Sequence, residues 1–268
     1  MALKLSARLV EKPWGRRELP AMFPASNGQR IGEVWFTAPE ELPLLVKYIF
    51  TSERLSIQVH PNDEQARERG LPQGKSECWY ILEAERGAEL GLGLKRCVTS
   101  DELRSAALDG SIEELLDWRE VKAGDFFSVP SGTVHAIGAG ISLLEFQQNA
   151  DVTFRLYDYG RPRELHLEDA VAVADRDCYP QHLAEHVSRG CSRLLVDGPH
   201  FTLLYVADEA DGAEALSDRQ RWVMPLEGQV RCGAFEAGPG ECLLVEANEP
   251  LSLDDVRVLI GAAGPLLR

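Results

Sequence analysis

The stretch "GDFFSVPSGTVH", residues 124 to 135, decides the fold. Its first two residues predict a turn, and residues 126 to 129 predict a short β-strand. Pro130 breaks that strand because it has no N–H for a sheet ladder, and Gly132 favours a tight turn. His135 follows three residues after Gly132. The stretch therefore predicts a strand, a sharp turn, and a histidine directly behind the turn.

The spacing G-x5-P-x-G-x2-H in this stretch resembles the second sequence motif of the cupins. The cupin pattern often carries an asparagine four residues after the histidine, whereas this chain has Ala139 there. The resemblance implies a small β-barrel in which His135 points inward at a metal ion.

A second stretch, "RLSIQVHPNDE" at residues 54 to 64, reads as a strand that ends at a proline. Side chains alternate along a strand, so Ser56, Gln58 and His60 share one face. Such a face can meet water, or it can hold ligands aimed into a pocket, and these residues alone leave both interpretations open.

The first cupin motif often supplies H-x-H and then a glutamate. Here the pattern is Q-x-H, and the glutamate is Glu77 in "QGKSECWYIL". The resemblance implies one metal site made by Gln58, His60, Glu77 and His135. Mixed nitrogen and oxygen donors suit Zn²⁺, one per chain, although Mn²⁺, Fe²⁺ or Co²⁺ would also be tolerated. The alternative is that these are separate polar residues with ordinary structural partners.

The remaining pattern is mainly β, with a few short helical insertions. Strands are predicted over 30–38, 43–51, 54–60, 77–84, 125–138, 141–148 and 152–160, and again in 193–262. Helices are predicted over 61–70, 99–110, 111–118 and 165–175, the second and third with capping boxes at Thr99/Glu102 and Ser111/Glu114.

The chain also contains a weak internal echo. The run from "CWYILEAERGAEL" to "VKAGDFFSVPSG" resembles the run from "RWVMPLEGQVRCG" to "AGPGECLLVEAN", with Glu246 in place of Pro130 and Leu251 in place of His135. We therefore predict a tandem cupin fold of double-stranded β-helix (jelly-roll) barrels. The predicted division is a catalytic, metal-binding domain at 1–165, a helical connector at 166–189, and a degenerate cupin-like domain at 190–268.

Composition narrows the function classes. The 268 residues carry a net charge of −15, which disfavours nucleic acid and anionic membranes as partners. No apolar run reaches the roughly 18 residues of a membrane span, and no signal peptide is recognised at the start. Six scattered cysteines without a CxxC motif predict reduced, mostly buried thiols and a cytoplasmic location.

The wider sequence resembles the type I phosphomannose isomerases (mannose-6-phosphate isomerases), and most of all their short bacterial form. The resemblance rests on "KPWGRREL", "PLLVKYIFTSERLSIQVHPNDEQA", "GKSECWYILEAERGAELGLGL" and "VPSGTVHAIGAGISLLEFQQNADVTFRLYDYGR". It runs from about residue 9 to 165 and thins over the C-terminal quarter. It implies a zinc enzyme of tandem-cupin fold that interconverts mannose 6-phosphate and fructose 6-phosphate.

The same resemblance implies roles for further residues. Arg155 matches the family's active-site arginine, Lys75 a lysine considered for proton transfer, and Glu145 and Asp151 acidic positions leading to the arginine. Ser56 and Arg161 match positions that hold the phosphate. The residues leave open whether Lys75 or Glu145 moves the proton. They also leave open a purely structural alternative, in which Lys75 is a solvated turn residue and Glu145 and Asp151 form ion pairs with Arg155.

Three functional hypotheses follow. The first is a metal-dependent aldose–ketose isomerase that acts on a small sugar phosphate as a monomer or homodimer. The second is another metal-dependent cupin enzyme, although Gln58 in a histidine position disfavours an iron oxygenase. The third is a non-catalytic sugar-phosphate-binding cupin.

Overall fold

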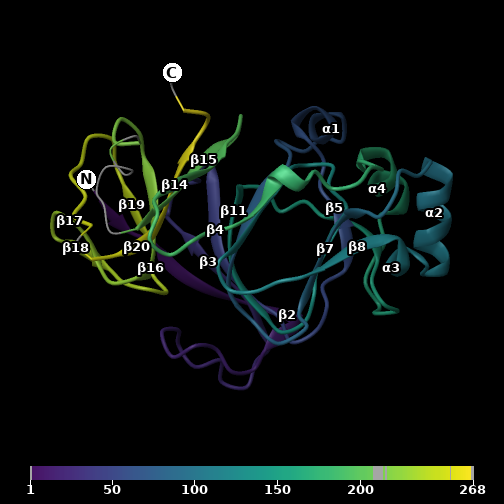
Figure 1. Cartoon of the computed structure of the whole chain (residues 1–268), viewed down its shortest axis with the longest axis horizontal. Coiled ribbons are helices and arrows are strands. Elements are labelled where there is room, and N and C mark those ends of the chain that lie inside the picture. The colour runs from purple at the N-terminus through teal and green to yellow at the C-terminus, as the bar shows by residue number, and fades with distance from the viewer. Residues whose placement is uncertain (1, 208–213, 215, 254, 267–268) are drawn as a thin grey trace.

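A computed structural model describes residues 2–207, 214, 216–253 and 255–266 (Figure 1). The fold is mainly β, as predicted, with strands arranged in sheets of seven, five, six and two strands. Within these residues, no helix is long and apolar enough to cross a membrane.

The largest sheet has seven strands in the order β13-β9-β6-β11-β4-β3-β2. The predicted strands at 77–84 and 141–148 have the predicted bounds, whereas the long β2 was not predicted. The strands are β2 (Ser6–Arg16), β3 (Ile31–Thr37), β4 (Leu44–Phe50), β6 (Glu77–Ala84), β9 (Asp125–Val129), β11 (Ile141–Gln148) and β13 (Ala184–His186).

A five-stranded sheet, ordered β12-β5-β10-β7-β8, faces the first and completes a barrel. Trp79 and Ile81 of the large sheet pack with Leu90 and Ile137 of the smaller sheet to form the barrel core. The predicted strand at 125–138 is interrupted at Pro130, as expected from its missing N–H. The strands are β5 (Ile57–Val59), β7 (Glu89–Leu94), β8 (Leu116–Glu120), β10 (His135–Ile137) and β12 (Phe154–Tyr157).

Helices cover the outer face of the five-stranded sheet (Figure 1), where they share an apolar cluster with β5, β10 and β12. The capping box at Thr99/Glu102 is confirmed, since each residue's side chain accepts from the other's backbone N–H. The box at Ser111 is wrong: its side chain caps nothing, and the predicted helix becomes strand β8 at Leu116. The helices are α1 (Asp63–Glu68), α2 (Ser100–Asp109), α3 (Ile112–Leu115), α4 (Leu167–Val173) and the 3-10 turn η1 (Gln181–Leu183).

The C-terminal part forms a six-stranded sheet ordered β1-β19-β16-β20-β15-β14, beside a two-stranded ribbon of β17 and β18. The order β19-β16-β20-β15-β14 repeats the order β9-β6-β11-β4-β3 of the first half, with antiparallel pairing throughout, which supports the predicted echo. The strands are β1 (Leu3–Lys4), β14 (Arg193–Asp197), β15 (Phe201–Ala207), β16 (Arg221–Glu227), β17 (Val230–Cys232), β18 (Phe235–Ala237), β19 (Leu243–Val245) and β20 (Arg257–Ala263).

The two large sheets share one apolar core. Phe146 of β11 belongs to the same buried cluster as Trp222 of β16, and the rings of Tyr80 and Tyr205 stack with centroids 6.1 Å apart. Strand pairing crosses the predicted domain limits twice, because β1 pairs with β19 and β13 pairs with β9. The division at 165 and 190 stays a prediction.

The second half of the echo, in which Leu251 stands in place of His135, nevertheless keeps one buried charged residue at a position equivalent to a metal-binding residue. Glu77 lies opposite Val129, and Arg221 lies opposite Val245, the residue that the echo aligns with Val129. Arg221 therefore occupies the position of Glu77 in the second half. It is 2% exposed, and its guanidinium donates to the Glu249 carbonyl at 2.6 Å.

The cysteine prediction holds only in part. All six cysteines are free thiols, but Cys97, Cys178 and Cys191 are exposed rather than buried.

Candidate metal centre and active site

Three side chains inside the first barrel bring metal-binding atoms together. His60 follows β5, Glu77 begins β6 and His135 begins β10, and their ligand atoms all lie within 4.8 Å of one another. His60 Nε2 is 3.6 Å from Glu77 Oε2, and His135 Nε2 is 3.4 Å from Glu77 Oε1. All three residues are at most 2% exposed, so the carboxylate and two imidazoles form one enclosed donor set.

Local structure explains why these side chains converge. Gly132 has φ of +91°, which glycine adopts without strain, and its N–H donates to the His60 carbonyl at 2.8 Å. That bond ties the turn before His135 to the end of β5. His135 Nδ1 lies 2.8 Å from the Thr133 carbonyl, so we assign the proton to Nδ1 and the free lone pair to Nε2.

Both imidazoles are held in the neutral form that a metal requires. Burial, reinforced by the nearby Lys75 ammonium, lowers the pKa of His60 to about 3. Burial also lowers the pKa of His135, against the opposing attraction of Glu77. For Glu77, burial alone would raise the pKa, but Lys75 and the imidazoles together hold the pKa of that carboxyl well below its usual range.

Gln58, the fourth predicted ligand, lies at the edge of this cluster. It stands directly opposite His135 in the β5–β10 ladder, and its amide nitrogen is 3.2 Å from His135 Nε2. Ser56 donates its hydroxyl to the Gln58 amide oxygen at 2.9 Å, so these two side chains share a face, as the strand alternation predicts. Turning the amide by half a turn would present its oxygen to the cluster.

Lys75 lies inside the cluster, not on a solvated turn. Its ammonium is 2.7 Å from Glu77 Oε2 and 3.2 Å from His60 Nε2, and the residue is 6% exposed. The structural alternative, in which Lys75 is a solvated turn residue, is therefore wrong. A buried amine in contact with the donor set is placed to act on whatever that set binds.

Glu145 lies beyond Lys75, on the floor of the barrel. Its Oε1 is 2.9 Å from Lys47 Nζ and 3.7 Å from Lys75 Nζ, and its Oε2 accepts from Trp79 Nε1 at 2.9 Å. The alternative that Glu145 pairs with Arg155 is thus wrong, since its ion-pair partners are the two lysines. Burial, and then Glu77, raise the pKa of Glu145 against the two ammonium groups.

Arg155 lies on β12, directly opposite Gln58 in the β5–β12 ladder. It is half-buried, and its Nε is buried without a hydrogen-bond partner in the described part of the chain. Burial and the neighbouring Arg163 lower the pKa of Arg155, while Asp158 and Asp151 oppose them. Asp151 is exposed in the loop before β12, so it reaches Arg155 by charge rather than by a buried ion pair.

Arg161, predicted to hold phosphate, is engaged by a buried carboxylate. Its Nη2 is 2.8 Å from Asp158 Oδ1 and donates to the Arg54 carbonyl at 2.8 Å. Arg163 donates two hydrogen bonds of 2.6 Å to the same carboxylate. Arg163 was not predicted from the sequence. Its position two residues after Arg161 was the available signal that a second arginine could bind the same carboxylate.

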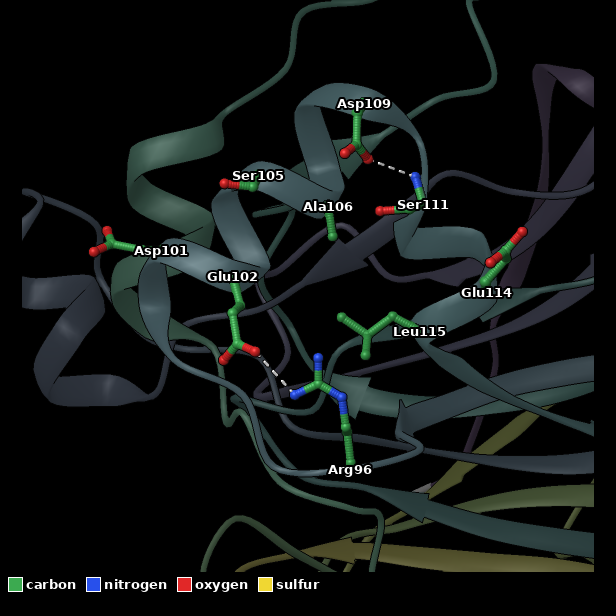
Figure 2. Close-up of a pocket in the computed structure, with 9 residues that line it drawn as sticks. All are labelled: Arg96, Asp101, Glu102, Ser105, Ala106, Asp109, Ser111, Glu114 and Leu115. Carbon is green, nitrogen blue, oxygen red and sulfur yellow. Dashed lines mark hydrogen bonds and ion pairs between the residues drawn. The ribbon is translucent and has the colours of Figure 1, made fainter.

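An open groove on α2 and α3 lies away from this centre (Figure 2). Its charged lining is mainly acidic, and its arginine, Arg96, pairs with Glu102 at 3.0 Å (Figure 2). Its lining includes none of the cluster residues, and its charge would repel a phosphate. The lining residues are Arg96, Asp101, Glu102, Ser105, Ala106, Asp109, Ser111, Glu114 and Leu115.

Comparison with known proteins agrees with this centre. Mannose-6-phosphate isomerase ManA of Bacillus subtilis is 46% identical over 155 residues, covering 55% of this chain and 49% of that protein. The mannose-6-phosphate isomerase of Streptococcus mutans is 46% identical over 137 residues, covering 49% of this chain and 43% of that protein. The chain thus spans about half the length of the curated relatives it matches.

A solved structure of the Bacillus subtilis mannose 6-phosphate isomerase superimposes with a TM-score of 0.80 at 26% identity, covering 97% of this chain and 98% of that one. The chain is similar in fold to this mannose 6-phosphate isomerase over nearly its whole length. The family resemblance and the cupin-type fold expected from the sequence are confirmed.

A zinc-bound mannose 6-phosphate isomerase shares the fold, with a TM-score of 0.70 at 15% identity, covering 99% of this chain and 100% of that one. A scan against models of protein families finds no match.

Proposed function

We propose that this chain is a metal-dependent aldose–ketose isomerase that interconverts mannose 6-phosphate and fructose 6-phosphate. The observation that carries the proposal is the enclosed set of His60, Glu77 and His135 with the Lys75 ammonium in direct contact. The choice of substrate, a small sugar phosphate, rests on the relatives that are named mannose-6-phosphate isomerase.

The donor set fits a divalent cation. Two neutral imidazoles and one carboxylate are the ligands that zinc takes at catalytic sites. In the proposal His60, Glu77 and His135 hold Zn²⁺ and Gln58 completes the set. The bound metal would stabilise negative charge on the sugar oxygens.

The chain's own residues would move the proton between C1 and C2 of the sugar. Lys75 is the group we assign to this transfer, because its Nζ touches the donor set whereas Glu145 Oε1 lies 3.7 Å behind it. Glu145, with its pKa raised by burial and by Glu77, is placed to exchange a proton with Lys75. One acid–base group facing both carbons is enough for an enediol(ate) reaction.

Arginines at the end of β12 would bind the anionic and polar parts of the substrate. Arg155 has a buried Nε without a partner among the described residues and stands beside Gln58, which suits it to the sugar oxygens. Asp158 holds Arg161 and Arg163 in fixed orientations. We assign the phosphate of the substrate to Arg161 and Arg163, with Ser56 as a further binding residue. Asp151, in the loop before β12, would influence the charge of Arg155.

A coupled assay tests the proposal. Purified protein should convert mannose 6-phosphate, but not unphosphorylated mannose, into fructose product, and metal analysis should find one equivalent of zinc. Oxygen consumption with bound iron would instead support another metal-dependent cupin enzyme. Tight sugar-phosphate binding without turnover would support a non-catalytic cupin.

We also propose a cytoplasmic location and a monomeric or homodimeric assembly. Six free thiols support a reducing compartment, the cytoplasm. Light scattering of the purified protein would distinguish the proposed monomer from the proposed homodimer.

A further inference from the structure

Two consecutive glutamines end β11, and only one of them has a partner for each end of its amide. Gln148 Oε1 accepts from the Ser76 N–H at 2.9 Å, and Gln148 Nε2 donates to Asp63 Oδ1 at 3.0 Å. Gln147 Nε2 donates to the carbonyls of Gln148 and Ala150 at 2.8 and 2.9 Å. Gln147 Oε1, by contrast, is buried without a hydrogen-bond partner among the described residues. Gln147 is 1% exposed, so bulk water does not reach that oxygen.

The two carbonyls fix which end of the Gln147 amide is which. Both are acceptors, so they require the NH₂ group, and a flipped amide would set its oxygen against two other oxygens. The unpartnered atom is therefore an acceptor oxygen that lacks a donor. Buried polar atoms in folded proteins are nearly always paired, because an unpaired one loses its hydrogen bonds to water without replacement.

The strand register places Gln147 beside the metal-binding residues. Gln147 is directly opposite Glu77 in the β6–β11 ladder, and side chains so placed on one face lie next to each other. That face is the barrel interior. Glu145, two residues earlier on the same face of β11, lies 3.7 Å from Lys75 Nζ and accepts from Trp79 Nε1.

None of the described neighbours on this inner face donates to Gln147 Oε1. On its other side the ladder places Leu45, whose side chain is apolar. The Lys75 ammonium is directed to Glu77 at 2.7 Å and to His60 at 3.2 Å. An ionised carboxylate such as Glu77 accepts hydrogen bonds and donates none. The donor must therefore come from a bound molecule, either a sugar hydroxyl or a water.

The proposed function limits which hydroxyl can reach this oxygen. The oxygens on C1 and C2 would lie at the metal-binding residues, and the phosphate on C6 would lie at Arg161 and Arg163. Gln147 is next to Glu77 on the seven-stranded sheet, whereas the two arginines follow β12 of the five-stranded sheet. The hydroxyl nearest to Gln147 is then the first one beyond the reacting carbons, on C3.

We propose that Gln147 Oε1 accepts a hydrogen bond from the C3 hydroxyl of the sugar phosphate, which makes Gln147 a substrate-binding residue that selects for this hydroxyl. The inference rests on the proposed function for the identity of the substrate. The competing explanation is a glutamine that only closes the end of β11, with a buried water on Oε1. It predicts that substitution of Gln147 leaves the preference for the C3 hydroxyl unchanged.

The test compares kcat/KM for mannose 6-phosphate with kcat/KM for its 3-deoxy analogue in the zinc-loaded protein. Gln147→Met keeps a similar length and removes the acceptor oxygen. The ratio of the two values should be about 3- to 10-fold larger in wild type than in Gln147→Met, the usual contribution of one neutral hydrogen bond. Any intrinsic effect of the missing hydroxyl on the reaction cancels in this comparison. An unchanged ratio in Gln147→Met would overturn the proposal.

Gln148→Met is the matched control, because Ser76 and Asp63 already occupy both ends of the Gln148 amide. It should leave the substrate ratio at the wild-type value, whatever it does to kcat itself. The 4-deoxy analogue is the control on the substrate, and its ratio should not respond to Gln147→Met. A ratio that falls equally in both variants would indicate a loosened β11 and would overturn the proposal.

Binding measurements separate this inference from the proposed function, because they need no turnover. In calorimetric titrations of the zinc-loaded wild type, mannose 6-phosphate should bind about 3- to 10-fold more tightly than its 3-deoxy analogue. This preference without turnover would contradict the isomerase activity and leave the Gln147 contact in place. Equal binding of the two compounds would overturn the contact.

A crystal structure of the wild-type protein with fructose 6-phosphate gives an answer even if Gln147→Met does not fold. The C3 hydroxyl oxygen should lie within about 3 Å of Gln147 Oε1. A water on Gln147 Oε1, with the C3 hydroxyl bound elsewhere, would refute the binding role even if the isomerase activity is established.

Discussion

At the scale of single residues, the metal-binding histidine provides the plainest prediction. His135→Ala removes one donor of the enclosed set, and we expect the bound zinc and the isomerase rate each to fall at least about 100-fold, beyond the effect of losing a supporting residue. Zinc analysis and the coupled assay measure both quantities. His186→Ala, at an exposed histidine whose ring pairs with Asp125, is the matched control and should change neither. Full activity of His135→Ala would refute the metal assignment.

The sequence predicted that His60, Glu77 and His135 lie together, but it did not predict the buried lysine, Lys47, that lies behind them. Spacing motifs point to His60, Glu77 and His135 because each stands at the edge of a recognisable turn or strand. Lys47 has no such signal: it is one charged residue in an apolar strand. Its partner Glu145 lies 98 positions away in the numbering of the sequence, and only the strand register brings them together.

At the scale of elements, two helix starts of similar sequence should respond differently to the same mutation. Thr99 accepts the Glu102 N–H, whereas Ser111 makes no capping bond with its side chain. Thr99→Ala should therefore cost about 1 kcal/mol of unfolding free energy, and Ser111→Ala should stay within about 0.5 kcal/mol. Thermal melting of both variants measures the difference. Equal destabilisation would contradict the observed capping.

The strands at 77–84 and 141–148 were predicted with the right bounds, because each segment is mainly apolar and a glycine-containing turn stands at one of its ends. The segment after Ser111 was mistaken for one helix because local propensity favours it. Leu116 instead begins β8, where the ladder with β7 satisfies its backbone. Pairing with β7 therefore outweighs the local helix preference of this segment, and no neighbouring residue in the sequence signals the change.

At the scale of the whole molecule, the shared core between the two large sheets carries a prediction about separability. A protein ending at residue 189 would leave Phe146, Tyr80 and Tyr48 without their cover from the second half. We expect it to aggregate, since an exposed apolar face of this kind drives association. Size-exclusion chromatography beside the full chain checks this. A well-folded, soluble fragment would show instead that the halves are independent domains.

Metal removal should also affect the whole molecule, because a ligand that binds only the folded state stabilises it. With free zinc at about 100 times its dissociation constant the gain is about 2.7 kcal/mol. Chelation should therefore lower the melting temperature by several degrees, with recovery when zinc is returned. In Glu77→Gln protein the shift on chelation should be much smaller.

The measurement that tests the central claim most directly is a zinc titration of chelated protein followed by the rate on mannose 6-phosphate. The account predicts no turnover without metal, and a rate that rises in proportion to bound zinc and levels off at one equivalent per chain. Turnover that persists in the metal-free protein, or one bound equivalent of zinc with no fructose 6-phosphate formed, would contradict it.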